Sequence, residues 1–373
     1  MITKITNGKV LLGGTFQNAD LYIEGKIILA IGGKIPFDRV VDAQGNYVTA
    51  GFIDLHCHGG GGVDFSDGEN VATPVMTHLR HGTTTLFPTV VSTDMAVLEK
   101  AICAIEKVNL PMIGGIHLEG PYLSPAQTGA QNPEALRRPA KEEYDPILKN
   151  HKIARWDYAP ERDENFGFLQ ALSEAGVVAA AAHTDATCRE MEAAADKGCR
   201  LITHLYSCTS TIRREKGFRI AGVVEATYLR DDIYAELIAD GCHLPPELLR
   251  LAYKQKGADK LALVTDAMRA AGTATSGEFE IGGVPCIIED GVAKLLDRSA
   301  FAGSIATADR LVRTCVKAGI SLADSVKMLT QTPATIMGLK GKGVLAPGYD
   351  ADIVIFDAEI GIRCVFVQGE QML

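Results

Sequence analysis

This sequence has no long apolar run, no excess of positive charge and, in its first residues, no pattern typical of a leader peptide. No 18 apolar residues follow one another, and residues 1–10 lack the charged start and apolar run of a signal peptide. We therefore expect a cytoplasmic protein with no membrane partner. Lys and Arg number 37 against 46 Asp and Glu, and the net charge of −9 argues against nucleic acid as the principal partner.

Paired cysteines are missing as well. The nine cysteines are scattered, and no two have the C-x-x-C spacing of a metal-binding or redox pair. Most lie in apolar or alternating stretches, so we interpret them as reduced core residues. A chain of 373 residues with 47% hydrophobic content can bury a core without cross-links.

The two ends of the chain carry strand patterns without a helical period. Residues 9–12, 19–32 and 40–48 alternate between apolar and polar positions, and 351–357 and 362–369 continue the pattern. We predict that residues 1–49 and 339–373 pair as one small β-sandwich domain. The long middle, residues 50–338, then forms the catalytic domain.

Short apolar runs alternate with amphipathic helical segments through the middle of the chain. There are eight such runs, at 52–58, 83–90, 112–119, 153–160, 177–183, 201–205, 233–240 and 261–266. This α/β alternation predicts a (β/α)8 TIM-like barrel. An open doubly wound sheet is the alternative, but residues 58–63 resemble its glycine fingerprint only superficially and no acidic partner follows. Residues 267–303 have the pattern of an inserted hairpin before a last helix.

Metal-binding residue types stand at the ends of six of these predicted strands. His56 and His58 share one face of the first strand, directly before four glycines. The other strand ends supply His117 and Glu119, His183, His204, Asp240 and His243, and Asp266. A single histidine in such a place is more often structural. Because active sites of these barrels lie at the carboxyl ends of the strands, six coincidences predict a centre for one or two metals.

These segments resemble the N-acetylglucosamine-6-phosphate deacetylase family of the amidohydrolase superfamily. The resemblance rests on the paired histidines in 51–59, His-Leu-Glu-Gly-Pro at 117–121, Thr-His-Leu-Tyr at 203–206, Ala-Asp-Gly-Cys-His at 239–243 and Val-Thr-Asp-Ala at 264–267, and it covers nearly the whole chain. It implies a metal-dependent amidohydrolase of amino-sugar catabolism. The implied reaction converts N-acetylglucosamine 6-phosphate to glucosamine 6-phosphate and acetate.

The resemblance also implies the roles of the polar residues. Glu119, His183 and His204 would bind the principal metal, His56 and His58 a second one, and Asp266 would serve as general base and acid. We expect one or two divalent ions per subunit, zinc first, with iron, cobalt or manganese as alternatives. The fourth strand offers no lysine that could be carboxylated to bridge two metals, and Glu119 can supply that negative charge. His117 shares the strand face of Glu119, and we interpret it as support for the ligands.

Substrate contacts are where the chain departs from the family. Ser207, Cys208 and Thr209 stand where Asn-Ala-Met is usual, and Gln131 replaces a histidine that polarises the carbonyl, although its amide can still donate a hydrogen bond. The resemblance implies phosphate binding by His243 together with an arginine of the partner subunit in a homodimer. Arg214 aligns with that arginine better than Arg213 does.

Two alternatives therefore stay open. One is deacylation of another small-molecule amino sugar, such as N-acetylgalactosamine 6-phosphate or an unphosphorylated sugar. The other is a non-catalytic amidohydrolase-like binding protein, which would be expected to have lost Asp266 or a metal ligand.

Overall fold

Eight parallel strands form the centre of the protein, and their order in the sheet is their order in the chain. The computed structural model describes every residue except residue 275. The strands are β6 (Phe52–Cys57), β9 (Thr83–Val91), β10 (Ile116–Glu119), β11 (Ile153–Tyr158), β12 (Val178–Ala181), β13 (Leu201–Ile202), β16 (Tyr234–Leu237) and β17 (Leu261–Leu263). The predicted (β/α)8 barrel is confirmed.

The first and last strands meet at the carboxyl end of the barrel. The Asp266 backbone N–H donates to the His56 carbonyl at 2.9 Å, and the His58 N–H donates to the Ala267 carbonyl at 2.9 Å. At the opposite end, Ile53 and Leu263 donate instead to the carbonyls of Leu329 and Met328, so this segment lies between the two strands. The barrel is therefore closed directly by backbone pairing beside the predicted site.

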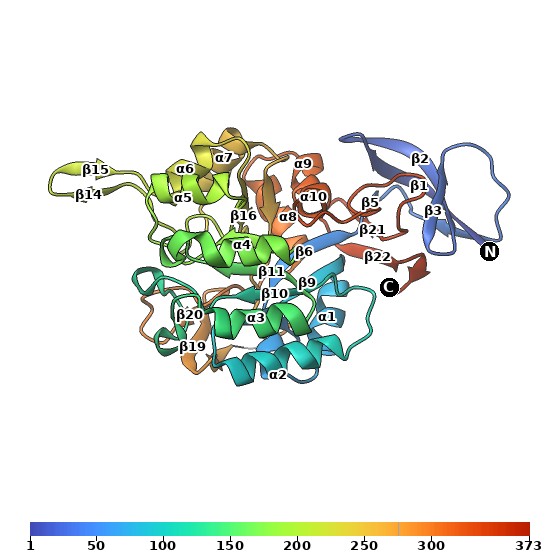
Figure 1. Cartoon of the computed structure of the whole chain (residues 1–373). Coiled ribbons are helices and arrows are strands. Elements are labelled where there is room, and N and C mark those ends of the chain that lie inside the picture. The colour runs from blue at the N-terminus through green and yellow to red at the C-terminus, as the bar shows by residue number, and fades with distance from the viewer. Residues whose placement is uncertain (275) are drawn as a thin grey trace.

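Helices surround this sheet (Figure 1). They are α1 (Ala72–Leu79), α2 (Met95–Glu106), α3 (Lys141–Asn150), α4 (Gly167–Glu174), α5 (Cys188–Asp196), α6 (Val223–Leu229), α7 (Pro246–Lys256), α8 (Ala308–Lys317), α9 (Leu322–Lys327) and α10 (Gln331–Ile336). Helix α5 shows how the sequence specifies them: Thr187 and Glu190 cap its first turn reciprocally, and Met191, Ala194 and Ala195 form its buried face. Among the described residues, no helix is long and apolar enough to cross a membrane.

Strands from both ends of the chain share a second sheet. It contains β1 (Ile2–Leu12), β2 (Thr15–Glu24), β3 (Ile27–Ile31), β4 (Arg39–Asp42), β5 (Tyr47–Ala50), β21 (Ile353–Phe356), β22 (Ile362–Val367) and β23 (Glu370–Gln371). The chain ends join where β5 pairs antiparallel with β21, with Val48 opposite Ile355. The exact division into domains at residues 49/50 and 338/339 stays a prediction.

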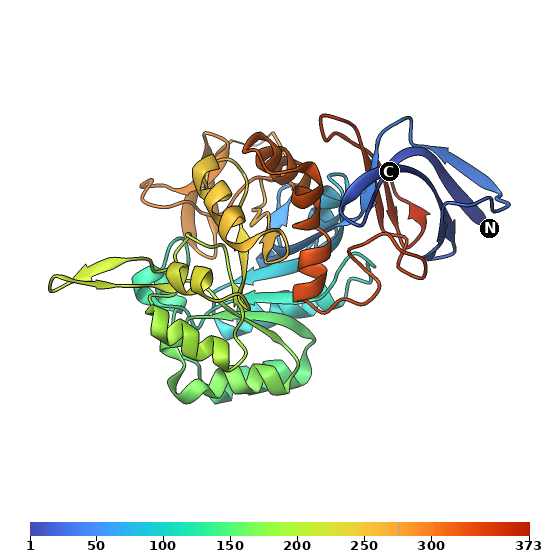
Figure 2. The same ribbon diagram turned by 90° about the horizontal axis from the view of Figure 1, so that it is seen from above.

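Smaller β elements lie around the carboxyl end of the barrel. Strands β18 (Gly277–Ile281), β19 (Val284–Glu289) and β20 (Val292–Leu295) form an antiparallel sheet within the predicted insertion. The hairpin of β14 (Arg213–Glu215) and β15 (Phe218–Ile220) projects away from the body, on the side opposite the terminal sheet (Figures 1 and 2).

Candidate active site

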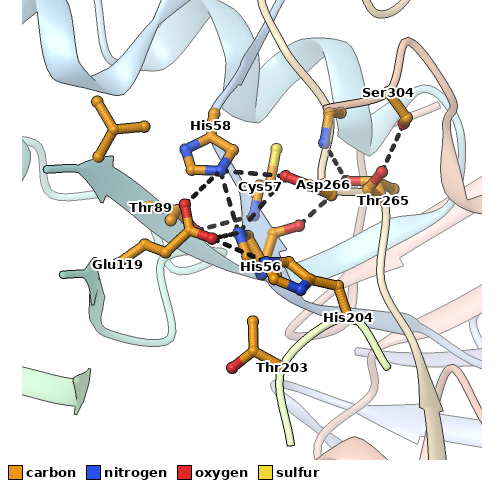
Figure 3. Close-up of polar contacts among 12 residues, drawn as sticks. His56, Cys57, His58, Thr89, Glu119, Thr203, His204, Thr265, Asp266 and Ser304 are labelled. Carbon is orange, nitrogen blue, oxygen red and sulfur yellow. Dashed lines mark hydrogen bonds and ion pairs between the residues drawn. The ribbon is translucent and has the colours of Figure 1, made fainter. Parts of the chain in front are cut away.

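Glu119 stands at the centre of a cluster of imidazoles. Its Oε1 atom lies 3.1 Å from His183 Nε2 and 3.0 Å from His204 Nε2. The strand-one histidines approach the same carboxylate, with their Nε2 atoms 3.0 Å apart and that of His58 3.3 Å from Glu119 Oε2 (Figure 3). All five side chains are buried, so five metal-ligating groups from four strand ends converge on one small volume.

Asp266 closes this cluster from the last strand. Its Oδ1 atom lies 3.1 Å from His58 Nε2 and 3.5 Å from His56 Nε2 (Figure 3). The preceding residue, Thr265, donates its hydroxyl to Asp54 Oδ2 at 2.6 Å and thereby ties the last strand to the first. The carboxylate of Asp266 is thus held on a fixed backbone and faces the cluster.

Three of the clustered residues have left-handed backbone conformations. The φ angles are 41° for His183, 30° for His204 and 45° for Asp266. Residues other than glycine rarely adopt positive φ, and such conformations concentrate at functional sites. These residues lie two or three positions beyond the ends of β12, β13 and β17, so the backbone turns sharply soon after the strand pairing stops.

The donor set fits a divalent cation. Two groups, Glu119 with His183 and His204, and Glu119 with His56 and His58, each have ligand atoms that all lie within 4.8 Å of one another. Burial alone would raise the pKa of Glu119, but the imidazoles, that of His56 first, outweigh it and hold the pKa well below its usual range. A charged carboxylate among imidazole nitrogens suits zinc and similar first-row ions.

His58 shows the same preference for positive charge. Burial would lower its pKa, yet its contacts with Asp266 and Glu119 outweigh burial and raise the pKa to about 10. Two carboxylates therefore favour a cation at the position that the paired imidazoles face.

The four glycines after His58 form a tight turn of the backbone and do not line the open cavity. They belong to the small hairpin of β7 (Gly59–Gly60) and β8 (Val63–Asp64), in which Gly61 has φ 64°. A Cβ atom at Gly59 would stand 2.3 Å from the Val63 carbonyl oxygen. The chain itself therefore occupies the space beside Gly59 that a side chain would need.

His117 lies behind the cluster. Its Nε2 atom is 2.9 Å from Asp157 Oδ1, its Nδ1 is 3.0 Å from Thr89 Oγ1, and its ring meets that of His56 edge-on at 4.7 Å. Burial, together with the nearby Arg155, lowers its pKa to about 4. His117 therefore supports the His56 ring as a neutral imidazole and does not face the ligand atoms of the Glu119 group.

A buried ion network beneath the site was missed by sequence reasoning. Arg155 pairs with Asp157, at 2.8 Å from Nε to Oδ1, and with both carboxylate oxygens of Glu236, and none of these side chains is exposed. Glu236 Oε2 also lies 3.6 Å from His56 Nδ1 and so helps to orient that ring. The sequence signal that could have indicated this network is the pair Arg155 and Asp157. These charged residues stand at alternate positions of the otherwise apolar β11, so both side chains point to the same face of the strand, inside the barrel.

A cavity of about 300 Å³ opens over the cluster and collects the predicted substrate-binding residues of this chain. Gln131, Ser207, Cys208 and His243 all line it. Gln131 donates to Glu119 Oε2 at 2.7 Å and accepts from the Ser92 N–H at 3.1 Å. His243 is fixed by Asp240, at 2.9 Å from Nδ1 to Oδ2.

Arg214 is the one predicted contact that does not reach this cavity within the chain. It is exposed on β14 in the projecting hairpin. Arg213 beside it pairs with Glu215 at 2.7 Å, whereas Arg214 has no ion-pair partner in the described part of the chain.

Comparisons with known proteins agree on one family. Residues 47–372 match the model of the amidohydrolase family. The chain is 34% identical to the N-acetylglucosamine-6-phosphate deacetylase of Lysinibacillus sphaericus, over 93% of this chain and 91% of that protein. It is 32% identical to the protein of the same name from Rattus norvegicus, over 99% of this chain and 95% of that protein.

Solved structures of proteins with that name are similar over the whole chain. The crystal structure from Pasteurella multocida has a TM-score of 0.93 at 28% identity and covers 100% of this chain and 99% of its own. The structure of a mutant from Mycobacterium smegmatis, in complex with N-acetyl-D-glucosamine-6-phosphate, has a TM-score of 0.91 at 32% identity. The match covers 100% of this chain and 98% of that chain.

Proposed function

Because this chain belongs to the amidohydrolase family, we propose that it hydrolyses N-acetylglucosamine 6-phosphate to glucosamine 6-phosphate and acetate. The observation that carries the proposal is the convergence of Glu119, His183 and His204 with Asp266 beneath a cavity of sugar size. Relatives with this activity in their names align over nearly the whole chain.

Glu119, His183 and His204 would hold the principal metal, and His56 and His58 a second one that shares the Glu119 carboxylate. Zinc is our first candidate, because nitrogen donors dominate the set and a single carboxylate completes it. A divalent ion held there would act as a Lewis acid and lower the pKa of water in the site.

Asp266 would move the proton. Its carboxylate, fixed beside His58, takes a proton from the attacking water and returns it to the departing amine nitrogen. One residue can serve both steps because the attacking oxygen and the departing nitrogen are bonded to the same carbonyl carbon.

Gln131 would orient the amide carbonyl. Accepting from the Ser92 N–H fixes the direction of its side-chain amide, and one of its two N–H groups is used by Glu119. The second N–H is then free to donate to the carbonyl oxygen as negative charge develops on it.

The sugar phosphate would lie at the other end of the cavity. Asp240 binds His243 Nδ1 and leaves Nε2 for a ligand, and Ser207 and Cys208 line the same cavity. We propose that Arg214 of a second subunit completes this end in a homodimer. Phe218 and Ile212 support this, since they are 74% and 60% exposed on or beside the projecting hairpin and would be covered by a partner.

Release of acetate from a small panel of N-acetyl sugars, with added zinc, tests the proposal. N-acetylglucosamine 6-phosphate should be the best substrate, ahead of N-acetylgalactosamine 6-phosphate and unphosphorylated N-acetylglucosamine. The latter two are the second candidates, because Ser207, Cys208 and Gln131 depart from the family pattern within the cavity itself.

A cytoplasmic location fits the nine cysteines, all of which are free thiols.

A further inference from the structure

A second cavity lies directly beside the catalytic one. It has a volume of about 360 Å³ and shares four lining residues with the first: His58, Val91, Met268 and Ile281. This volume is roughly twelve times the ~30 Å³ that one water molecule occupies in the liquid. The two spaces therefore meet beside His58, at the metal-proximal end of the site.

The proposed function fixes which part of a substrate faces this boundary. The phosphate end of the first cavity carries His243. The scissile carbonyl must lie between Glu119 and Asp266, within reach of Gln131. The acyl group on the far side of that carbonyl then points toward Val91, Met268 and Ile281.

We propose that the second cavity receives uncharged N-acyl chains longer than acetyl, such as butanoyl. The inference rests on the proposed function and deepens it. The bond broken stays the amide C–N bond: the hydroxyl of water goes to the acyl carbon, the amine takes the proton, and a longer carboxylic acid is released in place of acetate.

The boundary between the cavities is apolar and adaptable. Val91, Met268 and Ile281 belong to one small hydrophobic cluster with residues of the β18–β20 sheet, and they are 7%, 2% and 7% exposed. Methionine is unbranched, so the Met268 side chain can change rotamer and admit additional methylene groups. Each methylene buried from water is worth about fourfold in binding, which offsets part of that rearrangement.

The charged residues that line the second cavity disfavour acyl chains that carry a negative charge. Arg269 lies there, paired to Asp64 at 2.6 Å and to Asp67 at 3.0 Å, and Glu280 is a further lining residue. Two carboxylates thus already pair with the one guanidinium, and Glu280 adds a third carboxylate to the lining. A chain that ends in its own carboxylate would be repelled, whereas a neutral chain of similar length would not.

Three substrates test the proposal: the N-acetyl, N-butanoyl and N-succinyl derivatives of glucosamine 6-phosphate. We expect kcat/KM for the butanoyl compound within about thirtyfold of the acetyl value, and that for the succinyl compound more than about a hundredfold below it. A butanoyl value more than about thirtyfold below acetyl, or a succinyl value equal to butanoyl, would overturn the inference while leaving the proposed function intact. Failure with all three compounds would reject the proposed function itself.

A substitution that fills only the second cavity makes the test specific. Thr93 lines that cavity and not the first. Thr93→Trp should lower kcat/KM for the butanoyl compound by about tenfold or more and leave the acetyl value within about twofold, and the matched Thr93→Ser should change neither. Equal losses for both substrates, or no loss for either, would contradict the assignment. If Thr93→Trp does not fold, Val97→Trp replaces it, since Val97 lines the same cavity and is 44% exposed.

Discussion

Three of the residues that would do the chemistry are held in strained backbone conformations. His183, His204 and Asp266 each have positive φ, and each such conformation costs on the order of 1–3 kcal/mol. The surrounding structure imposes it: the Asp266 N–H is bound to the first strand, and Ser304 donates to the carbonyl of Thr265. This rigidity keeps the ligand atoms and the proton acceptor at fixed separations.

Asp266→Asn should fold, bind metal and lose turnover by about three orders of magnitude or more, because an amide cannot accept the proton of water. The substitution keeps size and shape, so the metal content of the purified protein should stay at the wild-type value. Measured kcat above about a tenth of wild type under saturating metal would reject Asp266 as the proton carrier.

Replacing both strand-one histidines should separate the two metal positions. His56→Ala/His58→Ala leaves Glu119, His183 and His204 unchanged, so elemental analysis should find about one ion per chain, and residual activity should persist. His151→Ala, on a histidine that contacts Glu106 far from the cluster, is the control and should retain the wild-type metal content. Loss of all metal from the double variant would show that the site of Glu119, His183 and His204 is not the tighter of the two.

The clustered residues were predictable because barrel strands end in register. Once 52–58 and 261–266 are identified as strands one and eight, His58 and Asp266 must meet. The Arg155 network was not predictable in the same way, because Glu236 is 81 residues from Arg155 in sequence and no local pattern links them. Sequence spacing gives the face on which a side chain lies, but not which inward charge it meets across the barrel.

At the scale of elements, strand positions were predicted better than strand lengths. The sixth run, 201–205, is a strand only over Leu201–Ile202, since His204 already has a left-handed backbone. The third run, from 112, begins as β10 at Ile116, after Gly115 with φ 152°. Apolar residues continue past the ends of the hydrogen-bonded ladder because the barrel buries them there as well.

Helix α8 carries an ion cluster that should make stability depend on pH. Asp309 in its first turn contacts His81 at 3.1 Å, Thr307 at 2.6 Å and Arg313 at 2.9 Å. Burial would raise the pKa of Asp309, but these partners, His81 first, outweigh it and lower the pKa to about 2. The contribution is therefore present above the ordinary pKa of an aspartate and is lost as pH falls toward 2.

Asp309→Asn should lower the free energy of unfolding at pH 7 by about 2 kcal/mol, and the difference from wild type should shrink as pH falls below about 4. Urea unfolding between pH 7 and pH 3 measures it. Asp259→Asn is the control: its partner is Lys327 but it is 76% exposed, so the change should stay under about 1 kcal/mol. A difference for Asp309→Asn that is independent of pH would show that packing, and not charge, holds the helix.

The whole molecule places its accessory elements at opposite ends of the barrel. The terminal sheet connects through β5 to the start of β6. The β14–β15 hairpin follows β13 in the chain and projects from the side of the barrel that carries the site (Figures 1 and 2). The terminal sheet is thus far from the chemistry. The hairpin extends away from its own cavity, which is why we propose that its exposed Arg214 serves a neighbouring molecule.

If Arg214 binds phosphate in a partner's site, Arg214→Ala should reduce kcat/KM for the 6-phosphorylated substrate by roughly tenfold to a hundredfold and leave the unphosphorylated one unchanged. Arg213→Ala is the matched control, because Arg213 is already paired with Glu215 within its own hairpin. Native mass measurement should give a dimer for both variants.

Subunit mixing then tests whether the arginine acts between subunits. Arg214→Ala and Asp266→Asn chains are each impaired alone, but in a mixed dimer the site on the Arg214→Ala chain receives an intact arginine from its partner and keeps its own Asp266. Random reassembly of equal amounts makes about half of the dimers mixed, with one complete site in each, so activity should recover to about a quarter of wild type. An Arg214 that acted within its own chain would leave every site defective, and mixing would restore nothing.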